Sequence, residues 1–315
     1  MFKSLKSIKS IKSINAIKST AAVASLALLA TLAACGPADS QQNADPDVAR
    51  SYDVSHVQKD DSVASLVPEK VAKTGELVVG VNVSYAPAEF FAADGKTPVG
   101  YEIDFSKALA KVMGLNAKIV HAQFDSIIPA IGSKYNVGIS GFTVNAERMK
   151  SVDFVTYANA GLSFEVRKGN PTKVDTKNLC GKKVTLETGT VGEPIMEEAK
   201  KQCAANNDKP LEIMSFKEQT DATTALLSGR ADVMYADTPV AGYAAVKNPG
   251  KLEIIGESQD AEPMGAAVKK GDSAMLKAVK AGIDKLMKSG IYKDILKKWG
   301  VEDVAIKQAV VNPKL

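Results

Sequence analysis

The sequence predicts an α/β protein made of two consecutive series of strands and helices. Short apolar runs alternate with segments of helical hydrophobic period from Glu76 onward, which is typical of βαβ units with a mostly parallel sheet. The alternation starts again near Lys182, and two apolar helix patterns follow toward the end of the chain. We therefore expect two lobes, each a mostly parallel sheet flanked by helices, and a helical tail that returns to the first lobe.

The expected strands follow from the apolar runs. They lie at residues 77–83, 118–121 and 137–139 in the first series and at 183–186, 212–215, 231–235 and 264–268 afterwards. Between the second and third strands, Asp125 or Ser126 is expected to cap a helix that has Pro129 in its first turn, where the missing N–H costs little. The sequence thus places the same strand and helix unit in both halves.

The first 35 residues are typical of a secretion signal. A Lys/Ser-rich start precedes an apolar stretch of about 14 residues, which is shorter than the ~20 residues of a membrane-spanning helix. Leu32-Ala33-Ala34-Cys35 then resembles the lipobox of bacterial lipoproteins, in which the cysteine thiol is acylated and the preceding peptide is removed. We expect lipid on Cys35 to anchor the protein to the outer face of the cell membrane. The alternative is an ordinary secreted protein with an incidental cysteine.

The charge of the chain is concentrated in that signal. Lysines alone carry charge before the first acidic residue, so the formal net charge of +4 falls to about −1 without residues 1–34. No Lys/Arg cluster lies beside aromatic residues, and nucleic acid is therefore not an expected partner. Residues 36–70 are rich in Asp, Gln, Asn and Ser and lack apolar periodicity, which predicts a flexible tether.

Cys180 and Cys203 remain in an exported chain, and a disulfide is the expected state of such a pair. The bond would join the two ends of one strand and helix unit and contribute roughly 3 kcal/mol through loop entropy. The two histidines, His56 and His121, are too few for a zinc site. We expect neither a metal nor a cofactor.

Several motifs follow one another between residues 76 and 300. In chain order they are Leu77-Val78-Val79-Gly80-Val81, Tyr85-Ala86-Pro87-Ala88-Glu89-Phe90, Gly100-Tyr101-Glu102-Ile103-Asp104-Phe105, Phe124-Asp125-Ser126-Ile127-Ile128-Pro129-Ala130, Ser140-Gly141-Phe142-Thr143, Glu147-Arg148, Val152-Asp153-Phe154, Gly229-Arg230-Ala231-Asp232-Val233 and Asp237-Thr238-Pro239. Together they resemble the polar amino-acid-binding family of bacterial extracellular solute-binding proteins.

The resemblance implies a two-lobed periplasmic-binding-protein-like fold. Lobe 1 would comprise residues 71–165 and 262–315, lobe 2 would comprise residues 166–261, and the ligand would lie in the cleft between them. A monomer of this kind captures a free amino acid by lobe closure and delivers it to the permease of an ABC importer.

The resemblance also implies the ligand contacts. Arg148 matches the arginine that binds the α-carboxylate, for which a planar guanidinium is well suited, and Asp237 matches the carboxylate that binds the α-ammonium. Tyr85 and Phe124 match the aromatic residues that sandwich the ligand side chain. The remaining expected contacts are Asn82, Gly141, Phe142, Thr143, Gly189 and Thr190.

Each assignment has a structural alternative. Arg148 could form a surface salt bridge, Asp237 could serve only as a helix cap before Thr-Pro, and the aromatic residues could pack in the core. The turn at Gly189 and Thr190 offers free N–H groups to a carboxylate but is also an ordinary helix start.

One position departs from the family pattern. Asn82 stands where members that bind basic or amide side chains often carry Asp, which favours a polar or neutral amino acid over lysine, arginine or ornithine. Two other functions stay open at this stage. One is a carboxylate-based lyase or dehydratase that uses Glu187 or Glu89, and the other is an amino-acid sensor for a membrane kinase.

Overall fold

The computed structural model describes residues 45–259 and 261–314. The expected signal, the lipidation site Cys35 and the start of the tether lie outside the described residues. Within the described part, no helix has the length and apolar character needed to cross a membrane.

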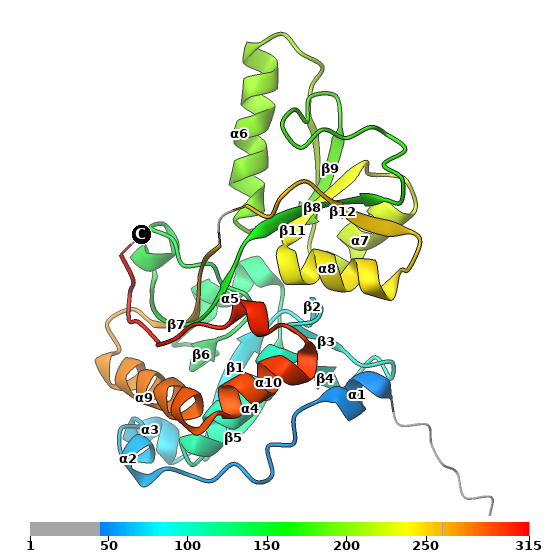
Figure 1. Cartoon of the computed structure of the whole chain (residues 1–315). Helices are drawn as coiled ribbons and strands as arrows, with labels where there is room; N and C mark the ends of the chain where they lie inside the picture. The colour runs from blue at the N-terminus through cyan, green and yellow to red at the C-terminus, as the bar shows by residue number, and fades with distance from the viewer. Residues whose placement is uncertain (1–44, 260, 315) are drawn as a thin grey trace, which may run out of the picture. The chain divides into compact units, whose positions relative to one another are not determined.

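Two five-stranded sheets organise the chain (Figure 1). The first has the order β5-β1-β6-β13-β7, in which β1, β5 and β6 are parallel and β13 is antiparallel to its neighbours. The second has the order β10-β9-β11-β8-β12, with β9, β10 and β11 parallel. In sequence order the strands are β1 (Glu76–Val81), β5 (Asn116–His121), β6 (Val137–Gly138), β7 (Val152–Ala160), β8 (Leu162–Arg167), β9 (Lys183–Glu187), β10 (Glu212–Phe216), β11 (Val233–Asp237), β12 (Leu252–Ile255) and β13 (Glu262–Lys269).

Helices cover both sheets. The larger helices are α4 (Tyr101–Val112), α6 (Gly192–Ala205), α7 (Gln219–Leu227), α8 (Thr238–Lys247), α9 (Ser273–Ser289) and α10 (Ile291–Trp299). Figure 1 shows α4, α9 and α10 with the first sheet and α6, α7 and α8 with the second. A small third sheet consists of β2 (Ser84–Tyr85), β3 (Glu89–Phe91) and β4 (Pro98–Val99). The α/β class and the return of the terminal helices to the first lobe are confirmed.

The chain passes from the first sheet to the second through one residue. Strand β7 ends at Ala160 and β8 begins at Leu162, so Gly161 marks the crossover, four residues before the boundary expected at 165/166. A Cβ at Gly161 would lie 2.1 Å from the carbonyl oxygen of Gln259 on the returning segment, which explains why only glycine fits there. The sequence did not predict this change of sheet, because the apolar pattern continues from β7 into β8.

The interpretation of residues 36–70 as a tether needs correction over residues 45–70. They contain α1 (Pro46–Arg50), α2 (Asp61–Ala64) and the start of α3 (Glu69–Ala72), and Val57, Val63 and Val67 are buried. Isolated valines in a polar segment gave no periodic signal, yet each finds a place in the core of lobe 1. Only residues 36–44 remain as the expected tether.

A second correction concerns α5 (Phe124–Ala130). The helix begins at Phe124, so Pro129 lies near its C-terminal end rather than in its first turn. The helix is too short for a missing N–H at that position to disrupt more than its last turn.

The expected disulfide is present. Cys180 and Cys203 are joined, with their Cα atoms 5.5 Å apart, and they tie the segment before β9 to the end of α6. Cys203 packs in the core of lobe 2 together with Leu186 and Met196.

Candidate functional site

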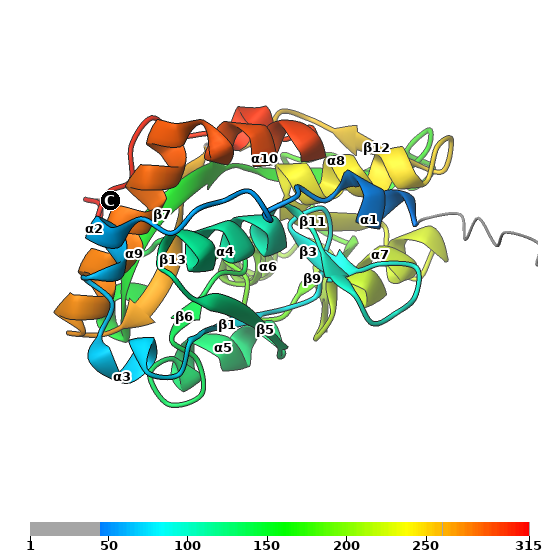
Figure 2. The same cartoon turned by 90° about the horizontal axis from the view of Figure 1, so that it is seen from below.

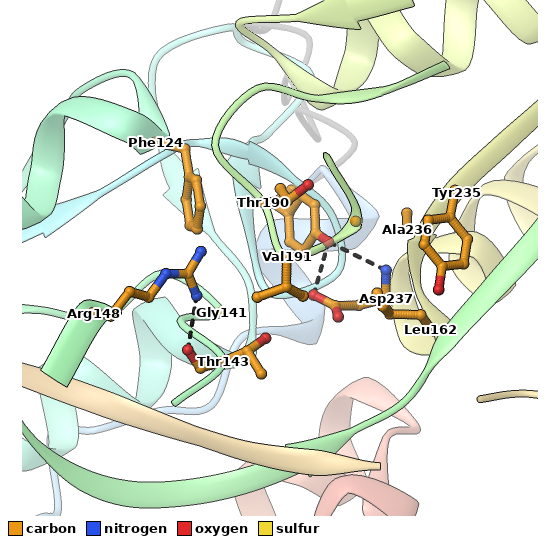
Figure 3. A pocket seen from close by; sticks show the side chains of 12 residues that line it. Phe124, Gly141, Thr143, Arg148, Leu162, Thr190, Val191, Tyr235, Ala236 and Asp237 are labelled. Carbon is orange, nitrogen blue, oxygen red and sulfur yellow. Dashed lines mark hydrogen bonds between the residues drawn. The ribbon is translucent and has the colours of Figure 1, made fainter. Parts of the chain in front are cut away.

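A pocket of about 310 Å³ lies between residues of the two lobes (Figure 3). The lining residues come from strand ends and adjoining turns, namely Tyr85, Phe124, Gly141, Thr143, Arg148, Leu162, Thr190, Val191, Gly192, Tyr235, Ala236 and Asp237. Parallel strands of each sheet end here, which is where open α/β sheets bind ligands.

Arg148 supplies the positive charge of the pocket. Its Nη1 donates to the Thr143 carbonyl oxygen at 2.8 Å, and its Nη2 donates to the Gly189 carbonyl oxygen of the other lobe at 3.0 Å. Burial lowers the pKa of Arg148 to about 10, so the guanidinium remains charged at neutral pH. Among the described residues no carboxylate forms a salt bridge with it, so the alternative of a surface ion pair does not apply. Three of its five N–H groups are left for other acceptors.

Asp237 lies across the pocket from Arg148 (Figure 3). Its Oδ2 accepts a hydrogen bond from the Tyr85 hydroxyl at 2.7 Å, and this bond joins the two lobes. The residue occupies the N-cap position of α8, but its side chain makes no capping hydrogen bond. Burial raises the pKa of Asp237 to about 7, against the opposing effects of the Tyr85 hydrogen bond and the Arg148 charge.

The aromatic wall is two rings deep. Phe124 lines the pocket, and the Arg148 guanidinium lies 5.2 Å from its ring centroid. Phe142 does not line the pocket but stacks behind Phe124, with ring centroids 4.9 Å apart. Phe142 therefore supports the wall from the core, where it is 1% exposed.

The turn after β9 forms the wall from lobe 2. Thr190, Val191 and Gly192 line the pocket, and α6 begins at Gly192. Gly189 lies behind this lining, where its N–H donates to Glu193 Oε2 at 2.8 Å and its carbonyl oxygen accepts from Arg148. The N–H groups of Val191 and Gly192 form no hydrogen bond to any residue in the described ranges. They are the donors that a helix N-terminus offers to an anion.

Gly141 is held by a buried acid. Its N–H donates to the two carboxylate oxygens of Glu102 at 3.2 and 2.9 Å and is therefore not free for a ligand. Its backbone has a φ of +57°, in the left-handed region that favours glycine. Gly141 and Thr143 nevertheless line the pocket, as expected.

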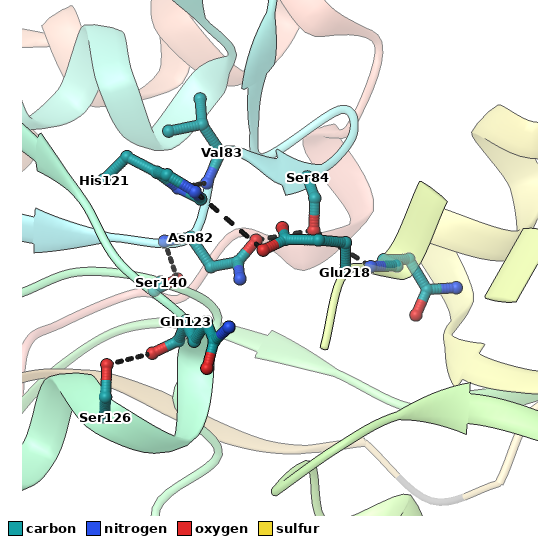
Figure 4. A network of polar contacts seen from close by, with 9 residues as sticks. Asn82, Val83, Ser84, His121, Gln123, Ser126, Ser140 and Glu218 are labelled. Atoms are coloured by element: carbon teal, nitrogen blue, oxygen red, sulfur yellow. Dashed lines mark hydrogen bonds and ion pairs between the residues drawn. The ribbon is translucent and has the colours of Figure 1, made fainter. Parts of the chain in front are cut away.

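Asn82 lies outside the lining, in a network that joins the lobes (Figure 4). Its Oδ1 accepts from the Ser84 hydroxyl at 2.5 Å, and Ser84 Oγ accepts from the Gln219 N–H of lobe 2 at 2.9 Å. The side chain is fully buried, and its Nδ2 has no hydrogen-bond partner among the described residues. Near this network His121 accepts from the Val83 N–H and lies 3.9 Å from Glu218.

Five lining residues were not predicted from the sequence: Leu162, Val191, Gly192, Tyr235 and Ala236. Val191 and Ala236 directly adjoin predicted residues, and Gly192 and Tyr235 lie one position further along the chain from them. Leu162 belongs to the crossover strand, whose role only the sheet order reveals.

Known proteins resemble this chain over most of its length. Residues 77–302 match the family model of bacterial extracellular solute-binding proteins, family 3. The arginine-binding protein ArgT of Corynebacterium glutamicum is 34% identical over 79% of this chain and 82% of its own. The L-cystine-binding protein TcyJ of Escherichia coli is 31% identical over 75% and 86%, respectively. The crystal structure of the ancestral amino acid-binding protein AncCDT-1, a precursor of cyclohexadienyl dehydratase, has a TM-score of 0.66 and 32% identity, over 75% of this chain and 99% of that one.

Proposed function

The chain belongs to family 3 of the bacterial extracellular solute-binding proteins, and we propose that it captures one free amino acid between its lobes for an ABC importer. The observation that carries the proposal is the pairing across the pocket of Arg148 from lobe 1 with Asp237 from lobe 2. The α-carboxylate and α-ammonium of an amino acid match these two charges. Its side chain would then lie against Tyr85 and Phe124.

The α-carboxylate end of the ligand has three sources of hydrogen bonds. Arg148 keeps N–H groups beyond those it gives to carbonyl oxygens, and the N–H groups of Val191 and Gly192 point from the other lobe. Charge-assisted bonds of this kind are the stronger ones in proteins. Thr143 completes the wall at this end.

Lobe closure follows from the division of the site. Hydrogen bonds join the lobes at the pocket and beside it, among them Tyr85 to Asp237, Arg148 to Gly189, Gln219 to Ser84 and Lys217 to Asp125. A ligand that touches both lobes would favour the closed state by its differential contacts, with the crossover at Gly161 as one strand of the hinge.

We further propose that Cys35 carries the lipid anchor, with residues 36–44 as the tether and the folded protein acting as a monomer. The lobes would then be residues 45–161 with 262–315, and 162–261. In this arrangement, acyl chains on Cys35 would keep the protein close to the permease.

Binding is measured by isothermal titration with the twenty amino acids, after unfolding and refolding to remove any retained ligand. We expect a micromolar ligand, which corresponds to about −8 kcal/mol. Arg148→Ala or Asp237→Ala should weaken binding at least a hundredfold. Arg230→Ala is the matched control, because Arg230 also lies over a phenylalanine ring, that of Phe216 at 5.6 Å, but outside the pocket. Equal loss in the control, or no ligand among the twenty, would refute the proposal.

A lyase is the second candidate, because AncCDT-1 is described as a precursor of a dehydratase. Glu187 is the carboxyl group that could serve it, since it is buried near the pocket. Mass spectrometry of the bound amino acid after long incubation separates the two functions. We propose binding without turnover, so the ligand should be recovered unchanged. A neighbouring gene for a membrane kinase instead of a permease would favour sensing.

A further inference from the structure

Glu187 is a buried acid at the inner edge of the cleft. It is the last residue of β9, and Asp237 is the last residue of the neighbouring parallel strand β11. Both residues therefore lie at the end of the sheet that adjoins the pocket. Glu187 is 1% exposed, and its Oε1 has no hydrogen-bond partner in the described structure.

The surroundings of Glu187 add negative charge and no compensating cation. Burial raises its pKa well above the usual value, and the charges of Glu218, Asp237 and Asp125 raise it further. Neither Lys217 nor Arg148 pairs with Glu187 in the described structure. Lys217 pairs with Asp125, and Arg148 donates to the carbonyl oxygens of Thr143 and Gly189.

Glu187 also acts on the part of the pocket assigned to the ligand side chain. Its charge contributes to the raised pKa of Tyr85, which lines the pocket, and of Glu89, which lies behind it. Glu89 accepts a hydrogen bond from Ser140, which in turn accepts from the N–H of Asn82. The charge of Glu187 in lobe 2 therefore influences a group of lobe 1 that is linked to Asn82 by hydrogen bonds.

Glu187 is the carboxyl group beside the pocket for which the backbone part of an amino acid provides no partner. An amino acid would satisfy Arg148 with its carboxylate and Asp237 with its ammonium, and only a cationic side chain would supply the counter-charge that favours the ionised form of Glu187. We propose that Glu187 is a specificity-determining residue that selects an amino acid with a cationic side chain. This inference rests on the proposed function.

The assignment reverses the expectation drawn from Asn82. A carboxylate is missing at position 82 in lobe 1, but lobe 2 supplies one at Glu187. Asn82 retains a hydrogen-bonding role, because its buried Nδ2 is unpartnered among the described residues. The negative charge that selects a basic ligand has thus moved from one lobe to the other.

The test compares L-arginine with L-citrulline, which has nearly the same shape but a neutral end group. Isothermal titration at pH 7 should show at least tenfold tighter binding of arginine to the natural protein. Glu187→Gln should remove that preference while citrulline affinity changes less than threefold. The matched control is Glu165→Gln, because Glu165 is also buried in the sheet of lobe 2 and unpartnered but lies inside β8 rather than at a strand end beside the pocket.

A second measurement needs no variant and so does not depend on the folding of Glu187→Gln. A cation at Glu187 would favour its charged form, so arginine should release more protons than citrulline when both are titrated in buffers of different ionisation enthalpy. Proton release from Asp237 is common to both ligands and cancels in the comparison. Equal release by the two ligands would overturn the assignment.

The outcomes separate the two proposals. If the natural protein binds a neutral amino acid and shows no preference for arginine, the role of Glu187 is wrong and the proposed function stands. A preference for arginine that survives Glu187→Gln, or is lost equally in Glu165→Gln, also overturns the assignment. If no amino acid binds, the proposed function fails and this inference fails with it.

Discussion

The buried carboxyl groups of the two lobes differ in their hydrogen bonding. In lobe 1, Glu102 accepts from Gly141 and from the Tyr157 hydroxyl at 2.5 Å, and Glu89 accepts from Ser140 at 2.6 Å. Burial together with the charge of Glu102 raises the pKa of Glu89 well above its usual value. Each of these two acids has at least one hydrogen-bond partner, although Glu89 Oε2 has none among the described residues.

In lobe 2, Glu165 has both carboxyl oxygens buried without a described partner, and Glu187 has one. An unpartnered buried carboxyl group is costly when charged, so both groups are held toward their neutral forms. They differ in position, because Glu187 ends a strand beside the pocket whereas Glu165 lies inside β8. The contrast indicates that lobe 1 is preorganised, while lobe 2 contains a carboxyl group that a ligand can satisfy.

The largest expected effect follows from removing Glu102 in lobe 1. Glu102→Ala would leave the Gly141 N–H and the Tyr157 hydroxyl without their shared acceptor. Each buried polar group left without its partner costs about 1–3 kcal/mol of unfolding free energy. Urea denaturation measures it, and ligand affinity should fall as well because Gly141 lines the pocket. Glu102→Gln, which keeps an acceptor, should cost less.

Removal of the disulfide should affect lobe 2 alone. Replacing Cys180 and Cys203 by Ala frees a loop with a sequence separation of 23 residues. Loop entropy predicts a loss of about 3 kcal/mol. Amide hydrogen exchange should show faster opening in β9 and α6, with β1 and β5 of lobe 1 unchanged. Uniformly faster exchange in both lobes would mean that they unfold as one unit.

Glu165 should make the free energy of unfolding depend on pH, independently of the groups in the pocket. Burial raises the pKa of Glu165 to about 8, while the unfolded chain has a value near 4.5. Its contribution is therefore fully present below the unfolded pKa and is lost as the pH rises toward 8. The slope reaches at most about 1.4 kcal/mol per pH unit. The free energy of unfolding is measured between pH 5 and 8 for the natural protein and for Glu165→Gln, and the difference between them gives the contribution of Glu165. If the two free energies change in parallel with pH, the prediction is wrong.

The sequence identifies residues that sit at regular positions on predicted elements. Arg148, Asp237, Thr190 and Tyr85 all lie in the pocket, because a motif fixes both the strand and the turn that follows it. Phe142 and Gly189 fall one layer behind, since neighbours on a strand or turn point in different directions and no motif states which direction faces the ligand. Asn82 lies outside the pocket lining for the same reason.

Contacts between segments that are far apart in the chain could not be predicted from the sequence. Gly161 is an ordinary glycine until Gln259 of the returning segment is placed beside it. Val63 is an isolated valine until α9 offers Gly282, where an added Cβ would lie 3.7 Å from Val63 Cγ1. Glu187 was noted only as a possible catalytic acid. Its lack of a counter-charge became visible when the side chains around it had been located.

The smallest expected effect concerns the N-terminal segment of lobe 1, which also contacts lobe 2. Asp45 accepts from the N–H of Ala93 in lobe 1, whereas Asp47 accepts from Tyr243 and Lys247 on α8 of lobe 2. Figure 2 shows α1 beside α8. These contacts should favour the closed arrangement slightly.

Asp47→Asn should therefore weaken ligand affinity about two- to threefold, because a partly exposed ion pair contributes less than about 1 kcal/mol. Titration at low and high salt measures it, since salt screens such a pair and should shrink the difference. The control is Asp61→Asn, whose ion pair with Lys59 lies within the N-terminal segment and does not cross between lobes. If both variants bind alike, α1 takes no part in closure, and the difference between the lobes is confined to the acids at the cleft.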